Sequence, residues 1–204
     1  MRVNVISDLH LEFDDLVLPG GDVLILSGDV CEAKNIKADR YDPEGIMFGF
    51  EHANRRPDRY IRFFKEECAK YRHVIYVMGN HEHYGFRFDK TYNQLLTNMP
   101  DNVRLLEKES TEIDGVLFIG ATLWTDCNKG DPITMMQLRS SMNDYRIVDN
   151  YYITIQHKQL MLSWVGKTAT MNSHLQVKQL YLIMLLLLIY NNNIIIYNNY
   201  NKIE

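Results

Sequence analysis

The chain has 204 residues, of which 46% are hydrophobic and 24% are charged, and its formal net charge at pH 7 is −4. These values are typical of one globular domain with a sizeable core, and no run of Lys or Arg indicates a nucleic-acid footprint. The three cysteines, Cys31, Cys68 and Cys127, form no Cys-x-x-Cys pair for zinc or redox chemistry. They are therefore predicted to be reduced thiols. Because the N-terminus also lacks a signal-peptide pattern, a cytoplasmic location is expected.

The first predicted strand, residues 3–6, ends just before Asp8 and His10. In an extended backbone, residues two positions apart point to the same side, so this carboxylate and this imidazole can aim at one point. The apolar run is typical of a buried strand, and ligands of open α/β sheets bind outside the carboxyl ends of the strands. The alternative for this pair taken alone is a helix cap at Asp8 and a solvated loop histidine at His10.

Two further apolar stretches repeat this design. A strand predicted over residues 22–27 ends on Gly28-Asp29, and a strand over residues 73–78 ends on Gly79-Asn80-His81-Glu82. A helix is predicted over residues 59–71, because the apolar side chains there fall on one face. The strand–helix–strand order favours parallel neighbours in one sheet. The carboxylates, the amide and the histidines are therefore predicted to meet at one edge of that sheet.

These motifs, in this order, resemble the calcineurin-like metallophosphoesterase superfamily. The match extends loosely to residues 120–124, Gly-Ala-Thr-Leu-Trp. The resemblance implies an α/β fold in which two β-sheets form a sandwich flanked by helices (αββα). It also implies hydrolysis of phosphomonoesters or phosphodiesters, as a phosphatase or phosphodiesterase, at a dinuclear metal site. The alternative, a haloacid-dehalogenase type of site, requires a second aspartate two residues after Asp8, where this chain has His10.

The resemblance also assigns roles to the site residues. Asp8 and His10 are expected to hold the first metal ion, Asp29 to bridge the two ions, and Asn80 to bind the second through its amide oxygen. His81 is expected to donate a proton to the leaving group. Many family members orient this histidine with an aspartate three residues after the bridging one. That position is Glu32 here, which is predicted to orient His81.

Two points about metals and histidines stay open at this stage. The oxygen and nitrogen donors suit Mn, Fe, Zn, Co or Mg, with manganese a natural first choice. The other histidine of the third motif, His83, has no role to carry over from the family and is interpreted as a solvated loop residue.

The remainder of the chain continues the α/β pattern. Residues 143–145 are expected to border the site. The other expectations are a helix at 88–99, short strands at 103–106, 109–113 and 116–120 (the last two a hairpin about Asp114-Gly115), a turn at 130–132, and helices at 135–142 and 154–165.

The C-terminal part departs from the family pattern. The resemblance requires a further histidine and a Gly-His-x-His motif, whereas His157 and His174 lack the matching flanks. Residues 189–203 consist only of Asn, Ile, Tyr and Lys, the residues of codons made from A and T. We therefore interpret residues 1–175 as an incomplete metallophosphoesterase-like domain and 176–204 as a low-complexity tail, truncated or frame-shifted. The C-terminal strands are expected to be missing and the second metal site to be incomplete.

Three functional hypotheses follow from the sequence. The first is a metal-dependent phosphoesterase acting on a small phosphate ester. The second is a catalytically impaired remnant that binds at most one metal ion. The third is a variant tethered to a membrane by residues 180–190, although this run is about half of what a membrane helix needs. The substrate and the oligomeric state are left open by the sequence.

Overall fold

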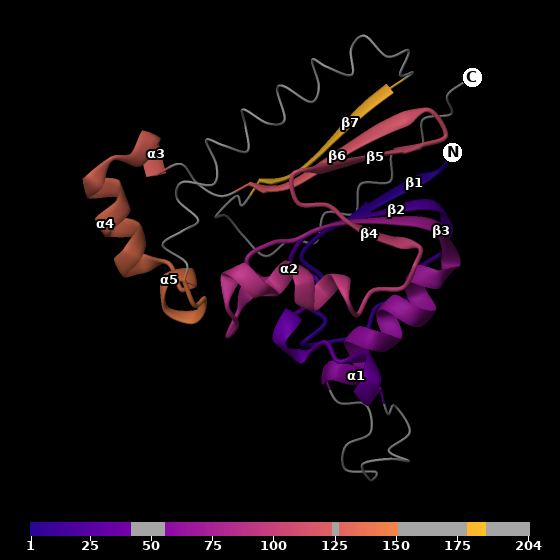
Figure 1. Ribbon diagram of the computed structural model, residues 1–204, viewed down its shortest axis with the longest axis horizontal. Coiled ribbons are helices and arrows are strands. Elements are labelled where there is room, and N and C mark those ends of the chain that lie inside the picture. Colours follow the sequence, from indigo (N-terminus) through magenta and orange to yellow (C-terminus); the bar gives the residue numbers. More distant parts are fainter. Residues whose placement is uncertain (42–55, 124–126, 151–178, 187–204) are drawn as a thin grey trace.

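The computed structural model describes residues 1–41, 56–123, 127–150 and 179–186. They form two stacked β-sheets with helices on the outer face of one sheet (Figure 1). The first sheet has the order β1-β2-β3-β4 and is parallel throughout. Its strands are β1 (Val3–Ile6), β2 (Gly21–Ser27), β3 (Tyr71–Val77) and β4 (Val103–Leu105). The parallel neighbours predicted from the sequence are confirmed.

The register of the first sheet aligns the strand ends that precede the three motifs. Ile6 lies opposite Leu26, and Leu26 lies opposite Tyr76. Each strand therefore leaves the sheet at the same level. The polar residues that follow are brought to one edge, as the sequence predicts.

Alternation of side chains along β2 explains why this strand is apolar without interruption. Leu24 and Leu26 pack in the core beneath the helices, whereas Val23 and Ile25 pack against the second sheet. Because successive side chains of a strand point to opposite faces, a strand covered on both faces needs apolar residues at every position.

The helices α1 (Arg56–Arg62) and α2 (Phe88–Leu96) cover the outer face of the first sheet (Figure 1). After α1 the chain continues through a π-helical turn, Phe63–Glu67, and a 3-10 turn, Cys68–Lys70. The helix predicted over residues 59–71 is therefore present, but it begins three residues earlier and β3 takes over at Tyr71. Two short 3-10 turns, Ala33–Asn35 and Ala38–Arg40, lie in the polar segment after β2.

The second sheet has the order β5-β6-β7. The strands β5 (Glu109–Ile113) and β6 (Val116–Leu123) form the predicted hairpin, and β6 runs three residues beyond its expected end. The strand β7 (Gln179–Leu186) pairs in parallel with β6. It falls in residues that were expected to be a tail or a tether, so the apolar run supplies a strand to this sheet.

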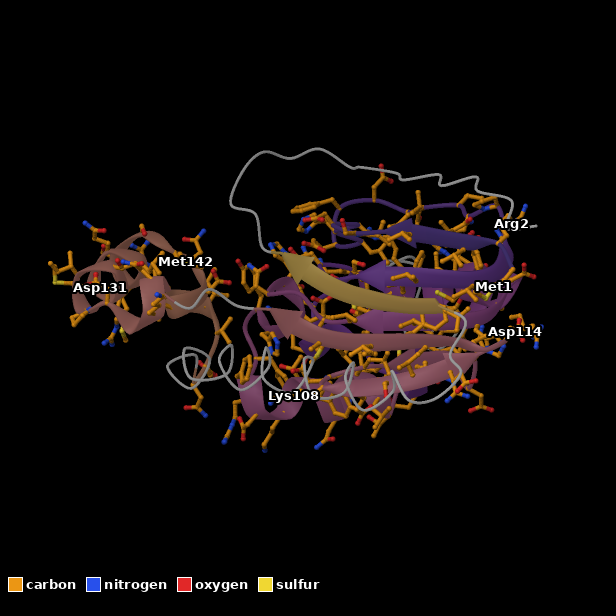
Figure 2. The ribbon with its side chains drawn as sticks, turned by 90° about the horizontal axis from the view of Figure 1, so that it is seen from above. Met1, Arg2, Lys108, Asp114, Asp131 and Met142 are labelled. Atoms are coloured by element: carbon orange, nitrogen blue, oxygen red, sulfur yellow. The ribbon has the colours of Figure 1, made fainter. Side chains whose placement is uncertain are left out.

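Three short elements lie apart from the sheets (Figure 1): α3 (Cys127–Gly130), which is a left-handed turn, and the helices α4 (Pro132–Ser141) and α5 (Asp144–Ile147). Asp131 and Met142, which flank α4, are far from the hairpin residue Asp114 in Figure 2. The predicted turn at residues 130–132 leads into α4: Gly130 has a positive φ of 80° and Asp131 is the N-cap, so the helix begins at Pro132, three residues before the helix predicted at 135–142. Asp131 accepts a hydrogen bond from the backbone N–H of Thr134 at 2.7 Å, and proline occupies the first turn.

Three smaller expectations have mixed outcomes. All three cysteines are buried as thiols, as predicted. The helix expected at residues 154–165 lies outside the described residues, as do His157 and His174. Within the described ranges, no helix has both the length and the apolar character needed to cross a bilayer.

Candidate metal centre

Backbone hydrogen bonds continue beyond the ends of β1 and β2 and hold the first two motifs together. The N–H of Asp8 donates to the carbonyl of Gly28 at 3.1 Å, and the N–H of His10 donates to the carbonyl of Asp29 at 2.9 Å. The two loops therefore leave the sheet side by side. This pairing brings the backbones of Asp8, His10 and Asp29 to one edge of the sheet, as expected from the sequence. The extended backbone from which Asp8 and His10 were expected to aim at one point is not observed.

The backbone at these three residues is left-handed. The φ angles are 55° at Asp8, 46° at His10 and 54° at Asp29. A left-handed backbone costs a residue with a Cβ about 1–2 kcal/mol. Such strain persists where the surrounding structure enforces it, and it clusters at functional sites. Three strained residues that all carry possible metal ligands therefore mark this edge as a candidate site.

The third motif is joined to the second by Glu82, which is fully buried. Its carboxylate accepts four hydrogen bonds, from the backbone N–H groups of Gly79 (2.7 Å), Val30 (2.8 Å) and Asp29 (3.1 Å) and from the hydroxyl of Tyr76 (2.6 Å). One side chain therefore fixes the ends of β2 and β3 relative to each other. These four bonds also satisfy the carboxylate itself, which would be costly to bury without partners.

Three side chains at this edge offer ligand atoms that all lie within 4.8 Å of one another: His10, Asp29 and His81. The backbone N–H of His81 donates to Oδ1 of Asp29 at 3.0 Å, and the rings of His10 and His81 meet edge to face at 4.3 Å. The carboxylate of Asp8 is exposed and lies outside this close group. Asp29, the residue expected to bridge two ions, is therefore within reach of both histidines.

The side chain of Asn80 is held through its amide nitrogen, which leaves its amide oxygen without a hydrogen-bond partner in the described part of the chain. Its Nδ2 donates to the hydroxyl of Tyr84 at 2.9 Å and to the carboxylate of Asp144 at 2.8 Å. Its Oδ1 is buried and has no hydrogen-bond partner among the described residues. A buried amide oxygen without a partner is costly unless something binds it, so the donor set fits a metal ion. Of residues 143–145, which were expected to border the site, Asp144 makes the contact with Asn80.

The carboxylate next to His81 is Glu12 rather than Glu32. Nδ1 of His81 and Nδ1 of His10 each lie 3.1 Å from Oε1 of Glu12. The carboxylate of Glu32 instead accepts hydrogen bonds from Asn35 at 2.6 Å and from Arg56 at 3.0 Å. The orienting contact expected for Glu32 is therefore made by Glu12. The His-x-Glu spacing after β1 is the sequence signal that would have pointed to it, since it repeats the two-residue spacing of Asp8 and His10.

Burial and neighbouring charges shift the acid–base behaviour of the cluster. Burial and the charge of Glu82 raise the pKa of Asp29 to about 7. The hydrogen bond with Glu12 outweighs burial and raises the pKa of His10. Burial opposes protonation of His81, but the hydrogen bond with Glu12 and the charge of Asp29 raise its pKa. Burial also opposes ionisation of Glu12, yet its hydrogen bonds with the two histidines hold its pKa well below the ordinary value.

His83 differs from its interpretation as a solvated residue. It is 1% exposed, and its ring stacks on Phe88 with centroids 4.4 Å apart. The ring of His81 stacks in the same way on Tyr84, at 4.2 Å. The 3-10 turn at His81–His83 therefore sends one histidine toward the metal cluster and packs the other against the start of α2.

Comparisons with known proteins agree with this geometry. A family model for calcineurin-like phosphoesterases matches residues 1–174. An uncharacterized protein of Acanthamoeba polyphaga mimivirus is 30% identical over 169 residues, which cover 76% of this chain and 55% of that protein. A UPF0046 protein of Caenorhabditis elegans is 27% identical over 135 residues, covering 60% of this chain and 39% of that one. The chain thus spans about half the length, or less, of these curated relatives.

Among solved structures, a phosphopantetheinyl hydrolase from Mycobacterium tuberculosis is similar with a TM-score of 0.50 and 18% identity. The similarity covers 90% of this chain and 67% of the hydrolase, and at this identity it supports the fold alone. The family match spans all three motifs and the parallel sheet that carries them. The chain belongs to the calcineurin-like phosphoesterase family.

Proposed function

We propose that this chain hydrolyses phosphate esters with the help of divalent metal ions held at the edge of the parallel sheet. One observation carries the proposal: His10, Asp29 and His81 converge within 4.8 Å beside the bare amide oxygen of Asn80. The family to which the chain belongs supports phosphoester chemistry at such a site. Phosphomonoesters and phosphodiesters are both candidate substrates.

The metal ligands in this proposal are those implied by the resemblance. Asp8 and His10 would hold the first ion, Asp29 would be shared between the two, and Asn80 would bind the second through Oδ1. Bound divalent ions such as Mn, Fe or Zn lower the pKa of a water molecule and neutralise charge on the phosphoryl oxygens. The amide of Asn80 adds no charge of its own, and its two hydrogen-bond acceptors, Tyr84 and Asp144, keep the oxygen pointed away from them.

His81 is the proton donor in this proposal. It lies beside Asp29 and Asn80, and its Nδ1 is in contact with the carboxylate of Glu12. A raised pKa keeps more of the imidazole protonated near neutral pH, which suits proton transfer to a leaving-group oxygen. Stacking on Tyr84 restricts the ring to one plane. Glu32 is not the orienting carboxylate in this proposal, because Asn35 and Arg56 occupy it and Glu12 contacts His81 instead.

A form with a single metal ion is the second candidate. Among the described residues, His10, Asp29 and His81 form the one close group of three acidic, histidine or cysteine side chains. This group is the observation that supports a single-ion form. We also keep the cytoplasmic location and the absence of a membrane partner as predictions.

Hydrolysis of p-nitrophenyl phosphate and of bis-p-nitrophenyl phosphate tests the proposal. The full chain is assayed with and without added Mn²⁺, beside the variant Asp29→Asn and the control Asp15→Asn, whose carboxylate pairs with Arg62 away from the cluster. Turnover that needs metal, survives in the control and is lost in Asp29→Asn supports the proposal. Equal turnover in Asp29→Asn contradicts it, and the preferred ester separates phosphatase from phosphodiesterase.

A further inference from the structure

We infer that Glu12 is a positioning residue that orients two histidines at once, His10 as a metal ligand and His81 as the proton donor. The inference rests on the proposed function for the meaning of these two roles. It goes beyond that function because one carboxylate oxygen would orient both a metal ligand, His10, and the proton donor, His81. Neither the resemblance nor the metal motifs assigns a role to Glu12.

The geometry of the contact is that of one acceptor shared by two donors. Oε1 of Glu12 lies 3.1 Å from Nδ1 of His10 and 3.1 Å from Nδ1 of His81. The two rings stand at 74° to each other with centroids 4.3 Å apart, so both nitrogens approach the same oxygen. The Glu12 side chain is 6% exposed, whereas the His10 and His81 side chains are 29% and 24% exposed. The carboxylate therefore lies beneath the rings.

Helix α1 holds Glu12 in this place independently of the histidines. Arg59 of α1 donates to the carbonyl of Leu11 at 3.1 Å and to the carbonyl of Glu12 at 2.5 Å. The N–H of Leu11 donates to the carbonyl of Val30 at 3.0 Å. The backbone on both sides of the carboxylate is therefore fixed by side-chain and main-chain bonds. Its charge is in position before any ligand arrives, as a preorganised site requires.

The contact with Glu12 determines which ring nitrogen of His10 is free to bind a metal ion and which ring nitrogen of His81 is free to donate a proton. An ionised carboxylate only accepts hydrogen bonds, so the Nδ1 of each ring in contact with it must carry a proton. Nε2 of His10 is then left with its lone pair, as a metal ligand needs. Nε2 of His81 is the nitrogen left to carry the proton that goes to the leaving group. This is the carboxylate–histidine arrangement that fixes tautomers at metal sites, used here for two rings.

The test compares Glu12→Gln and Glu12→Ala in the full chain with the matched variant Glu67→Gln. Glu67 accepts from the backbone N–H of Leu18 at 2.5 Å, so its replacement loosens the same loop without touching the histidines. Long-range ¹H–¹⁵N spectra of the metal-free chain report the tautomers of His10 and His81. Mn²⁺ affinity and turnover of p-nitrophenyl phosphate and phenyl phosphate report the two roles.

We expect Nδ1-protonated rings in the wild type and in Glu67→Gln, and mixed tautomers in Glu12→Ala. Mn²⁺ affinity should fall by about 10–100-fold in Glu12→Ala, with a smaller loss in Glu12→Gln, whose amide oxygen still accepts. The fall in kcat should be larger for phenyl phosphate than for p-nitrophenyl phosphate, because the poorer leaving group depends more on the proton donor.

Unchanged tautomers and unchanged Mn²⁺ affinity in a folded Glu12→Ala overturn the inference, and so does an equal loss in Glu67→Gln. If Glu12→Ala does not fold, the same readouts on Glu12→Gln decide. Failure of the proposed function has a different signature. In that case the wild type turns over neither ester, while the tautomers and the metal affinity still respond to Glu12.

Discussion

The carboxylate of Glu82 accepts a hydrogen bond from the backbone N–H of Asp29 at 3.1 Å, although the two residues are 53 positions apart in the chain. This bond is one of four that Glu82 accepts beneath the metal cluster. The residue that is expected to bridge the metal ions is thus held by the core of the protein. Several properties of the site depend on this coupling.

Replacing Glu82 with alanine should destabilise the fold by about 3 kcal/mol or more. The substitution leaves three buried backbone N–H groups without an acceptor, and each such group costs about 1–3 kcal/mol unless water reaches it. Urea unfolding measures the change. The control Tyr76→Phe removes only one donor and should cost about 1 kcal/mol. If the free energy of unfolding of Glu82→Ala lies within about 1 kcal/mol of the wild-type value, the hydrogen bonds of Glu82 are not needed for stability.

Gly79→Ala should damage the metal site directly. A Cβ at this position would overlap the carboxylate and the backbone nitrogen of Asp29, and neither can move freely. We expect loss of Mn²⁺ binding and of turnover in a protein that still has its strands by circular dichroism. Gly115→Ala is the control, because a Cβ there meets nothing within 4 Å and only its positive φ of 75° is strained. Normal metal binding in Gly79→Ala would contradict the position assigned to Asp29.

Metal affinity should rise with pH between about 6 and 8. Burial and the charge of Glu82 raise the pKa of Asp29 to about 7, and the Glu12 contact raises the pKa of His10. A metal ion must displace these protons, so each one released steepens the dependence by up to about tenfold per pH unit below the pKa. Calorimetric titration with Mn²⁺ in two buffers of different ionisation enthalpy counts the protons. Binding without proton release would refute this expectation.

Without metal, the free energy of unfolding should fall as pH rises, which is the opposite of the trend in metal affinity. His10 and His81 have raised pKa values, so their contribution is present below the ordinary histidine value of 6.5 and is lost as pH rises through the folded values. Glu12 has a lowered pKa, so its contribution is present above 4.5 and is lost in acid. The raised pKa of Asp29 also disfavours the fold as pH rises toward 7.

Unfolding free energy measured without metal should therefore be largest near pH 5–6 and should decline toward pH 8. In Glu12→Gln the decline should be shallower, since the charge that favours both imidazolium ions is gone. Added Mn²⁺ should restore stability at pH 8 by mass action. A flat profile in the wild type would mean that the Glu12 contacts do not persist in solution.

The sequence was sufficient to predict the first sheet and the edge at which its polar residues gather. Strand ends at Asp8, Asp29 and Asn80 are visible because a buried parallel strand is an apolar run that stops abruptly on polar residues. The convergence of these ends follows from parallel pairing, which the order of strands and helices already favours. The confirmed part, the parallel order of the strands, is thus the part encoded by local pattern.

Contacts between distant loops could not be predicted in this way. Glu12 stands in an acidic turn that looks solvated, and only the packing of α1 and the His81 loop buries it. Glu32 fits the spacing of the family motif, yet Arg56 and Asn35 take up its carboxylate. His83 stands in a polar motif, and Phe88 at the start of α2 covers its ring.

The sequence analysis missed the start of α4 and the strand β7 for a different reason. Gly130-Asp131-Pro132 contains the residues of a turn, but Asp131 and Pro132 equally start a helix, and the bond to Thr134 decides between them. The β7 run of Gln179–Leu186 is apolar without a strand-like flank, so its partner β6 decides its conformation. In both cases the local sequence permits two structures and a contact selects one.

The most direct test of the central claim is turnover of p-nitrophenyl phosphate measured against bound Mn²⁺ at pH 7.5 for the wild type and Asp29→Asn. We expect the wild type to bind Mn²⁺ and its turnover to rise in proportion to the metal bound. We also expect Asp29→Asn to lose both metal binding and turnover while remaining folded. Metal binding and hydrolysis that are unaffected in Asp29→Asn would contradict a metal centre at this edge of the sheet.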